Sequence, residues 1–104
     1  MLGHFDTRRL ADIRANILRT VAAKRTELVI IDLTGLQAID TWVAANILET
    51  SQAIRLLGSQ VALTGISPAI AQTITYLGVS FSNITIAQTP QHALEQYSSY
   101  IANN

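Results

Sequence analysis

The chain has 104 residues, of which 49% are hydrophobic and only 13% are charged, so it predicts one folded domain over residues 1–104 and excludes a disordered chain. It contains no cysteine, which excludes disulfides and thiolate metal sites. The sequence has neither the roughly 20-residue apolar run of a membrane helix nor a signal-peptide pattern, so we expect a cytoplasmic protein with no membrane partner.

The formal net charge is zero, but the charges are distributed unevenly. Six of the seven basic residues lie in the first 25 positions, whereas Glu95 is the only Asp, Glu, Lys or Arg from Leu56 onward. The C-terminal half therefore has either a neutral polar surface or a surface covered by other protein, and both interpretations stay open. The basic segment alternates with acidic and apolar residues and lacks stacked aromatics, so we expect no nucleic-acid partner.

The first predicted element is a helix over residues 6–25, with Asp6 as its N-cap. Its apolar stripe recurs at three- and four-residue spacing and consists of Leu10, Ile13, Ile17 and Val21. Residues 27–33 follow, and their unbroken apolar run predicts a strand that is buried on both faces.

A second helix is predicted to begin near Asp40 or Thr41 and to end before Gly58, which suits a glycine C-cap. We expect its buried face to consist of Val43, Ile47, Ile54 and Leu57, with Ala44 and Leu48 beside them. Residues 60–66 are then predicted to form a strand.

The third helix is predicted over residues 67–78, with Ser67 as cap, Pro68 at its first position and Gly78 at its end. Its expected buried face consists of Ile70, Ile74 and Leu77. A short strand over residues 83–87 and a last helix over residues 89–104, with Thr89 as cap and Pro90 at its first position, complete the chain.

Alternation of strands and helices indicates an α/β fold with a central, mostly parallel sheet flanked by helices. Three strands make a thin sheet, so one edge is expected to need another strand.

Residues for metal or acid–base chemistry are sparse. The two histidines, His4 and His92, lie in different elements, and no glycine-rich phosphate loop is present, so we expect no metal, no cofactor and no catalytic residue. Asp32 and Asp40 flank the loop after the first strand, where ligands bind in open parallel sheets. No acid–base partner accompanies them, which favours a loop-amide acceptor at Asp32 and a helix cap at Asp40.

Thr41 lies at the expected start of the second helix, near free backbone N–H groups and the positive end of the helix dipole. A phosphate would be tolerated there and would add about −1.5 to −2 charges to the surface. Thr41 is therefore a candidate phosphorylation switch, although threonine is also favoured at helix starts for structural reasons.

Residues 3–95 resemble the STAS domain, the sulfate transporter and anti-sigma factor antagonist family, and in particular the RsbR- and RsbS-type proteins of the bacterial stressosome. The resemblance is carried jointly by the motifs DLTG (32–35), IDT (39–41), RLLG (55–58), LTGI (63–66) and the proline-to-LG pattern over 68–78. It implies a STAS-like layered fold without enzymatic activity. It also implies that a serine/threonine switch kinase phosphorylates Thr41, on a partner-binding surface that consists of Asp32, Asp40, Thr41 and Trp42.

The resemblance to RsbR-type members also implies a second phosphorylated threonine, for which Thr73 and Thr75 are the candidates. The motif match favours Thr73, whereas the expected exposure on the helix favours Thr75. Both stay open.

The implied function is a scaffold that assembles with other STAS proteins, holds the switch kinase and regulates a sigma-factor stress pathway. A stand-alone antagonist that binds its kinase one-to-one is one alternative. A small-ligand or nucleotide-binding module is another, and it would use the loops at 32–41 and 65–68. Against the family pattern, the two strands expected before the first helix are missing or shortened. The separate N-terminal sensory domain that the resemblance to RsbR-type members would imply is not found in this sequence, so we assign no signal sensing to it.

Overall fold

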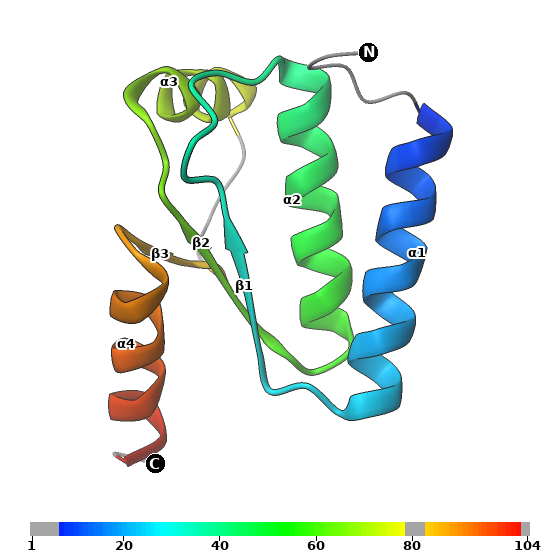
Figure 1. Ribbon diagram of the computed structural model, residues 1–104, viewed down its shortest axis with the longest axis vertical. Coiled ribbons are helices and arrows are strands. Elements are labelled where there is room, and N and C mark those ends of the chain that lie inside the picture. The colour runs from blue at the N-terminus through cyan, green and yellow to red at the C-terminus, as the bar shows by residue number, and fades with distance from the viewer. Residues whose placement is uncertain (1–6, 79–82, 103–104) are drawn as a thin grey trace.

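The computed structural model describes residues 7–78 and 83–102, in which helices and strands alternate (Figure 1). The elements in chain order are α1 (Thr7–Lys24), β1 (Leu28–Asp32), α2 (Thr41–Leu56), β2 (Gln60–Thr64), α3 (Pro68–Leu77), β3 (Thr85–Ala87) and α4 (Pro90–Ala102). This order confirms the expected one. The predicted cap Asp6 lies outside the described residues.

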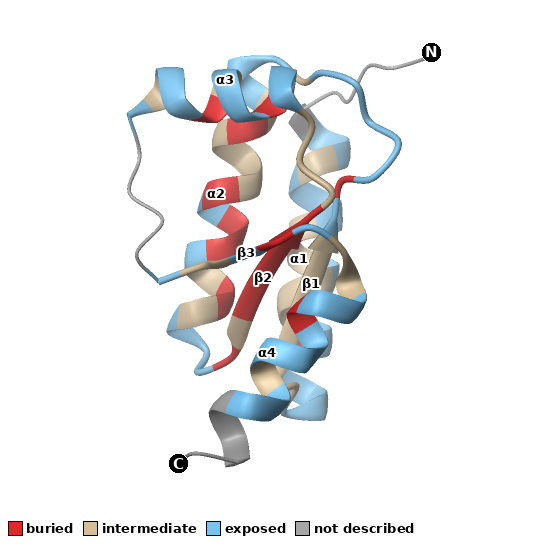
Figure 2. Ribbon diagram, turned by 90° about the vertical axis from the view of Figure 1, so that its left-hand side faces the viewer, coloured by how far each residue is buried: buried red, intermediate tan, exposed pale blue. Residues whose placement is uncertain are grey.

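The three strands pair in the order β1-β2-β3, and both pairings are parallel. Val29 lies opposite Val61, and Leu63 lies opposite Ile86. Helix α2 packs on β2 from one face of the sheet and α4 packs on all three strands from the other, as the two views together show (Figures 1 and 2). Helix α3 packs on α2 at the end of the sheet where β1 and β2 finish.

Strand β2, and not β1, is the strand that is buried on both faces. The last four residues of β2 are buried, whereas the first four of β1 are half-buried, as the red and tan ribbons of Figure 2 show. The prediction that residues 27–33 are buried on both faces is therefore wrong. The reason is that β1 lies at the edge of the sheet and α1 packs on α2 rather than across β1.

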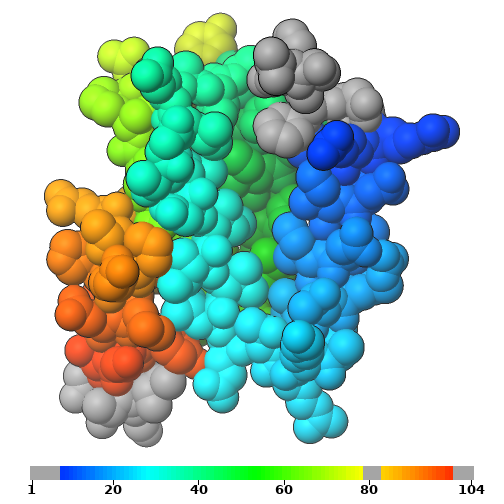
Figure 3. All heavy atoms as spheres, in the orientation of Figure 1, coloured from blue at the N-terminus to red at the C-terminus, as the bar shows by residue number. Residues whose placement is uncertain are grey.

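A furrow runs beside the exposed edge of β1, between that strand and α1, with side chains of α2 at its floor (Figure 3). It holds a hollow of about 170 Å³. The apolar residues that line this hollow are Leu10, Ile13, Ile17, Ile31, Val43 and Ile47. Three members of the apolar stripe predicted for α1 therefore line this hollow, and one of them, Ile13, stays 40% exposed, whereas the fourth, Val21, is buried and lines a different hollow.

The core has a separate part on each face of the sheet. On the α2 and α3 side, the buried cluster consists of Leu33, Ala44, Ile70 and Ile74. On the α4 side it consists of Ala62, Ala87 and Ala93, whose small side chains let α4 approach the strands closely.

The buried face of α2 is rotated from the predicted one. Ala44, Leu48 and Ile54 are buried, whereas Leu57, which was expected to be buried, is 48% exposed. Leu57 is the C-cap residue of α2, and Gly58 after it takes the positive φ of 94° that suits glycine, so the predicted glycine ending is confirmed.

The predicted starts of the two proline-led helices are confirmed. The Ser67 hydroxyl accepts a hydrogen bond from the Ile70 N–H, and Pro68 is the first residue of α3. The Thr89 hydroxyl accepts one from the His92 N–H in the same way, ahead of Pro90.

Candidate functional site

The carboxylate of Asp32 ties together the ends of β1 and β2. Its Oδ1 accepts hydrogen bonds from the Thr34 hydroxyl at 2.8 Å, the Thr64 hydroxyl at 2.9 Å and the Thr34 backbone N–H at 3.2 Å. The bond from the Thr34 hydroxyl, followed by the other two, holds the pKa of Asp32 below its ordinary value. The interpretation of Asp32 as an acceptor of loop amides is therefore confirmed, and two threonine hydroxyls add to it.

Gly65, which follows β2, lies directly against Thr34. It has a φ of 70°, and a Cβ atom there would lie 2.6 Å from the Thr34 backbone nitrogen and 2.8 Å from its Cα. Glycine is therefore required both by the backbone conformation and by the close approach of the β1 loop. This contact holds the C-terminal ends of β1 and β2 close together, at the end of the sheet where α2 and α3 begin.

Helix α2 begins at Thr41, and Asp40 is its N-cap. The Asp40 carboxylate accepts a hydrogen bond from the Val43 N–H at 2.8 Å, and the Asp40 backbone is extended, with φ −84° and ψ 172°. This confirms the predicted cap. Because Asp40 does the capping, the Thr41 hydroxyl is not needed for it, and Thr41 itself is exposed.

The four residues predicted to form a partner surface, Asp32, Asp40, Thr41 and Trp42, are all exposed. Two large apolar side chains near Thr41 in the sequence are exposed: Trp42, the next residue, by 40%, and Leu36, in the preceding loop, by 44%. No charged residue lies in the loop over residues 33–39. The start of α2 therefore combines exposed apolar side chains with the carboxylates of Asp32 and Asp40, and it presents the Thr41 hydroxyl at the positive end of a helix.

The two candidate second threonines differ in their surroundings. Thr73 is half-buried, and its hydroxyl lies 3.2 Å from the Ile39 carbonyl oxygen and 3.1 Å from that of Ala69. Thr75 is exposed. The structure thus brings Thr73, and not Thr75, into contact with the loop that leads to Thr41.

Sequence reasoning missed Thr34 and Thr64 as hydrogen-bond donors to Asp32. A signal was present in the sequence, because the tripeptide Leu-Thr-Gly occurs at the end of both strands. It follows β1 at 33–35, and it overlaps the last two residues of β2 at 63–65. Parallel neighbouring strands bring their C-terminal ends to the same edge, so this repeat could have predicted a paired platform.

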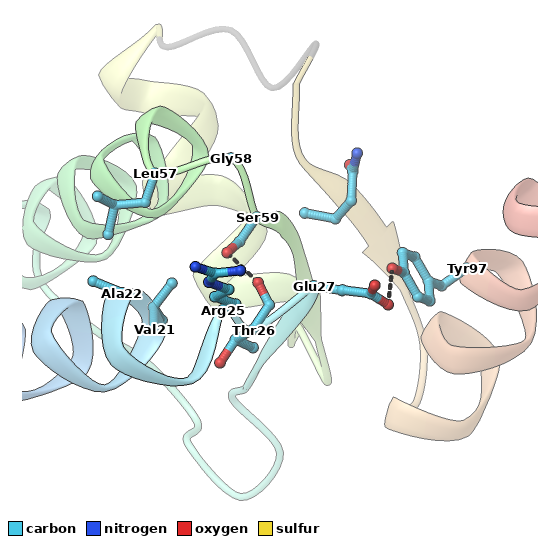
Figure 4. A pocket seen from close by; sticks show the side chains of 10 residues that line it. Val21, Ala22, Arg25, Thr26, Glu27, Leu57, Gly58, Ser59 and Tyr97 are labelled. Atoms are coloured by element: carbon cyan, nitrogen blue, oxygen red, sulfur yellow. Dashed lines mark hydrogen bonds between the residues drawn. The ribbon is translucent and has the colours of Figure 1, made fainter.

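The two loops proposed to bind a small ligand, residues 32–41 and 65–68, do not line the same hollow. A hollow of about 480 Å³ lies at the opposite pole, where β1 and β2 begin, and Figure 4 shows Arg25, Glu27 and Tyr97 around it. The Tyr97 hydroxyl donates to a Glu27 carboxylate oxygen there at 3.1 Å. Another hollow of about 440 Å³ includes Gly65 and Ile66 but none of the residues 32–41.

Within residues 7–78 and 83–102, no group of three or more His, Cys, Asp or Glu side chains is placed to hold a metal ion. His92 is exposed on α4, and His4 lies outside the described residues. In the same part of the chain, no helix combines the length and apolar character that crossing a membrane requires.

Comparison with known proteins supports one family. The profile of the STAS domain matches residues 2–93. The chain is 40% identical over 95 residues to the RsbT co-antagonist protein RsbRA of Bacillus subtilis, and 41% identical over 97 residues to RsbRB of the same organism. These matches cover 91% and 93% of this chain but 35% of each relative, so the chain spans about a third of their length.

Solved structures agree with this match. A structure of Moorella thermoacetica RsbS with a serine-to-glutamate substitution superposes with a TM-score of 0.80 and 26% identity, covering 88% of this chain and 80% of that one. A structure from the stressosome, described as a signal integration and transduction hub, gives a TM-score of 0.79 at the same identity and coverage. The expected α/β layered fold is confirmed, and the chain belongs to the STAS-domain family, with homology to the RsbR and RsbS proteins of the stressosome.

Proposed function

We propose that this domain is a phosphorylation switch and scaffold of a stressosome-like complex, with Thr41 as the residue that is modified. The observation that carries the proposal is the position of Thr41. It is exposed at the first position of α2, while the neighbouring Asp40 satisfies the capping requirement of the helix. The names of the relatives, which describe them as RsbT co-antagonists, support a related partner for this chain.

A phosphate on Thr41 would act through charge. It would lie near the backbone N–H groups of the first turn of α2, which tolerate an anion, and would add about −1.5 to −2 charges. The side chains of Leu36 and Trp42 are large, apolar and exposed, so a partner protein can cover them. A doubly charged group on such a surface opposes the docking of an apolar or acidic partner, so phosphorylation releases what the unmodified surface holds.

We propose a serine/threonine switch kinase as the partner held by this surface, and a second phosphorylation at Thr73 or Thr75. Thr75 is exposed and open to a kinase, whereas Thr73 is half-buried and bonded to the loop. In this proposal the domain binds and assembles in the cytoplasm and catalyses no reaction itself.

Assembly with other STAS domains is supported by the surface of the chain. Leu56 is 88% exposed, Tyr76 is 83% exposed and Leu94 is 54% exposed. These side chains lie in the half of the chain where Glu95 is the only charged residue. Exposed large apolar side chains in a part of the chain with so little charge favour contact with other proteins.

The test is phosphorylation by a candidate switch kinase, followed by intact-mass and peptide mass spectrometry. We expect one phosphate on the wild type that is absent from Thr41→Ala and retained in Thr41→Ser, which keeps the hydroxyl. Thr75→Ala and Thr73→Ala then show which residue carries any second phosphate. An active kinase that leaves wild-type Thr41 unmodified would overturn the proposed switch.

Native mass measurement separates the scaffold from the one-to-one antagonist. A large oligomer formed alone or with a second STAS protein supports the scaffold. A monomer or dimer that binds the kinase in a one-to-one complex supports the simple antagonist.

A further inference from the structure

Two hydroxyl groups of the α3 segment hold the chain that leads into α2. The Ser67 hydroxyl donates to the Gln37 carbonyl at 2.8 Å, and the Thr73 hydroxyl lies 3.2 Å from the Ile39 carbonyl. The partners in each pair are 30 and 34 residues apart in the sequence. The segment 37–40 is therefore held by side chains of the α3 segment, which follows α2 and β2 in the chain.

The contact at Thr73 is more than the usual bond of a helical threonine. A threonine inside a helix commonly donates to the carbonyl four residues earlier, which here is Ala69 at 3.1 Å. The same hydroxyl also reaches Ile39, so its one proton is shared between the helix and the loop. Ile39 is anchored on its other side as well, because its side chain packs against the buried cluster of Leu33, Ala44, Ile70 and Ile74.

The carbonyl that Thr73 holds belongs to the peptide bond that joins Ile39 to Asp40. Asp40 is the residue whose carboxylate caps α2 through the Val43 N–H, and Thr41 is next in the chain. Fixing that peptide plane therefore fixes the cap, and the cap fixes the first turn that presents the Thr41 hydroxyl.

We infer that Thr73 is a positioning residue for Thr41: its hydroxyl holds the Ile39 carbonyl and so sets the conformation in which Thr41 meets its kinase. The role of Thr41 rests on the proposed function, whereas the hold on the Ile39–Asp40 segment rests on the contacts alone. The state of Thr73 thereby controls how readily Thr41 is modified.

Phosphorylation of Thr73 would release this hold. Transfer of the γ-phosphoryl group of ATP to Oγ1 forms an O–P bond, releases ADP and the hydroxyl proton, and leaves Oγ1 with no proton to donate. The added phosphate oxygens would face the Ile39 carbonyl oxygen and repel it. Modification of the exposed Thr75 leaves the Ile39 contact intact, so the two candidate second sites have different consequences for Thr41.

The first test is hydrogen exchange of the Val43 amide, measured by NMR in the wild type, Thr73→Val, Thr73→Ser and Thr75→Val. Valine keeps the shape of threonine but has no hydroxyl, so it removes the contacts with both the Ile39 and the Ala69 carbonyl. We expect exchange at Val43 to accelerate about three- to tenfold in Thr73→Val, the equivalent of one ordinary hydrogen bond. Thr73→Ser and Thr75→Val stay close to the wild type.

Two results would overturn the inference. One is an unchanged Val43 exchange rate in Thr73→Val. The other is an equal acceleration at the buried β2 amides of Val61 and Leu63, which would mean a loss of global stability rather than a local release. A rise confined to Val43 supports it.

The second test is the kinetics of Thr41 phosphorylation in the same four proteins. We expect kcat/KM to be about three- to tenfold lower in Thr73→Val than in the wild type, because a mispositioned Thr41 hydroxyl reacts less readily. In Thr73→Ser, which keeps the hydroxyl at position 73, we expect the wild-type value. Equal values in all four proteins would overturn the control of Thr41 by Thr73. If wild-type Thr41 is not phosphorylated at all, the proposed function fails, while the exchange rates still decide whether Thr73 holds the segment.

Discussion

Helices α2 and α3 begin at the same end of the sheet, yet their starts are built differently. Each follows a Leu-Thr-Gly tripeptide, at 33–35 before α2 and at 63–65 before α3. Helix α3 starts almost at once, with Ser67 and Pro68, whereas α2 starts several residues later, at Thr41. Two similar strand endings are thus followed by a short connection in one case and a longer loop in the other.

The two helix starts differ in whether a hydroxyl is left over after the helix has been capped. At the start of α3, the Ser67 hydroxyl accepts from Ile70 and donates to Gln37, and Pro68 has no hydroxyl to modify. At the start of α2, Asp40 supplies the cap, and the exposed Thr41 follows it. The comparison shows that the hydroxyl at the start of α3 is used in hydrogen bonds within the fold, whereas the start of α2 exposes a hydroxyl that is not needed for capping.

The largest expected effect comes from replacing the glycine that joins the two strand endings. Gly65→Ala should lower the free energy of unfolding by about 3 kcal/mol or more, because the new Cβ would meet the Thr34 backbone and the φ of 70° disfavours alanine. Urea unfolding, followed by circular dichroism, measures this loss.

The matched control is Gly35→Ala in the other tripeptide. Gly35 has a φ of 93° but no atom within 4 Å of an added Cβ, so we expect only the conformational cost of about 1–2 kcal/mol. Equal losses at the two glycines would show that the close contact between Gly65 and Thr34 contributes nothing.

An intermediate effect is expected from removing the two caps. Ser67→Ala should cost about 1.5–2 kcal/mol, since it removes both the cap on Ile70 and the bond to Gln37. Asp40→Ala should cost about 1 kcal/mol, since it removes the cap alone. Denaturant unfolding of both variants gives the order, and a larger loss for Asp40→Ala would contradict the supporting role of Ser67.

The smallest effect concerns the pH dependence that Asp32 confers. Its native pKa is lowered, so the ionised carboxylate stabilises the fold. This contribution is fully present above the ordinary pKa of about 3.9 and is lost as the pH falls from there through the lowered native value. The effect is small because Asp32 is exposed and solvent screens its charge.

Asp32→Asn keeps an acceptor oxygen and removes the charge. The melting temperature of the wild type should exceed that of Asp32→Asn near pH 6, and the difference should shrink as the pH approaches 3. Thermal unfolding across this range measures it. A difference that stays constant with pH would exclude the ionised Asp32 as its source.

Several features of the fold were predictable because they depend on neighbours in the chain. Ser67, Pro68 and Gly78 marked the bounds of α3, and Asp40 marked the start of α2, because caps are local hydrogen bonds or backbone conformations. The position of Thr41 at the start of α2 could be predicted for the same reason.

Other features were not predictable from the local pattern. Burial of β1 was predicted wrongly because an apolar run does not reveal which strand lies at the edge of a sheet. Leu57 fits the helical stripe of α2 but lies past the last turn of the helix, so it is exposed.

By itself, the sequence determined the order of helices and strands, their caps and the position of Thr41 at a helix start, since each depends on residues within one turn or one strand. Only the tertiary structure decided that Thr64 reaches Asp32, and that Thr73 reaches Ile39. These partners are brought together by the parallel pairing of β1 and β2 and by the packing of α3 on α2. A hydrogen bond between residues some 30 positions apart forms only after the fold has placed them within about 3 Å of each other.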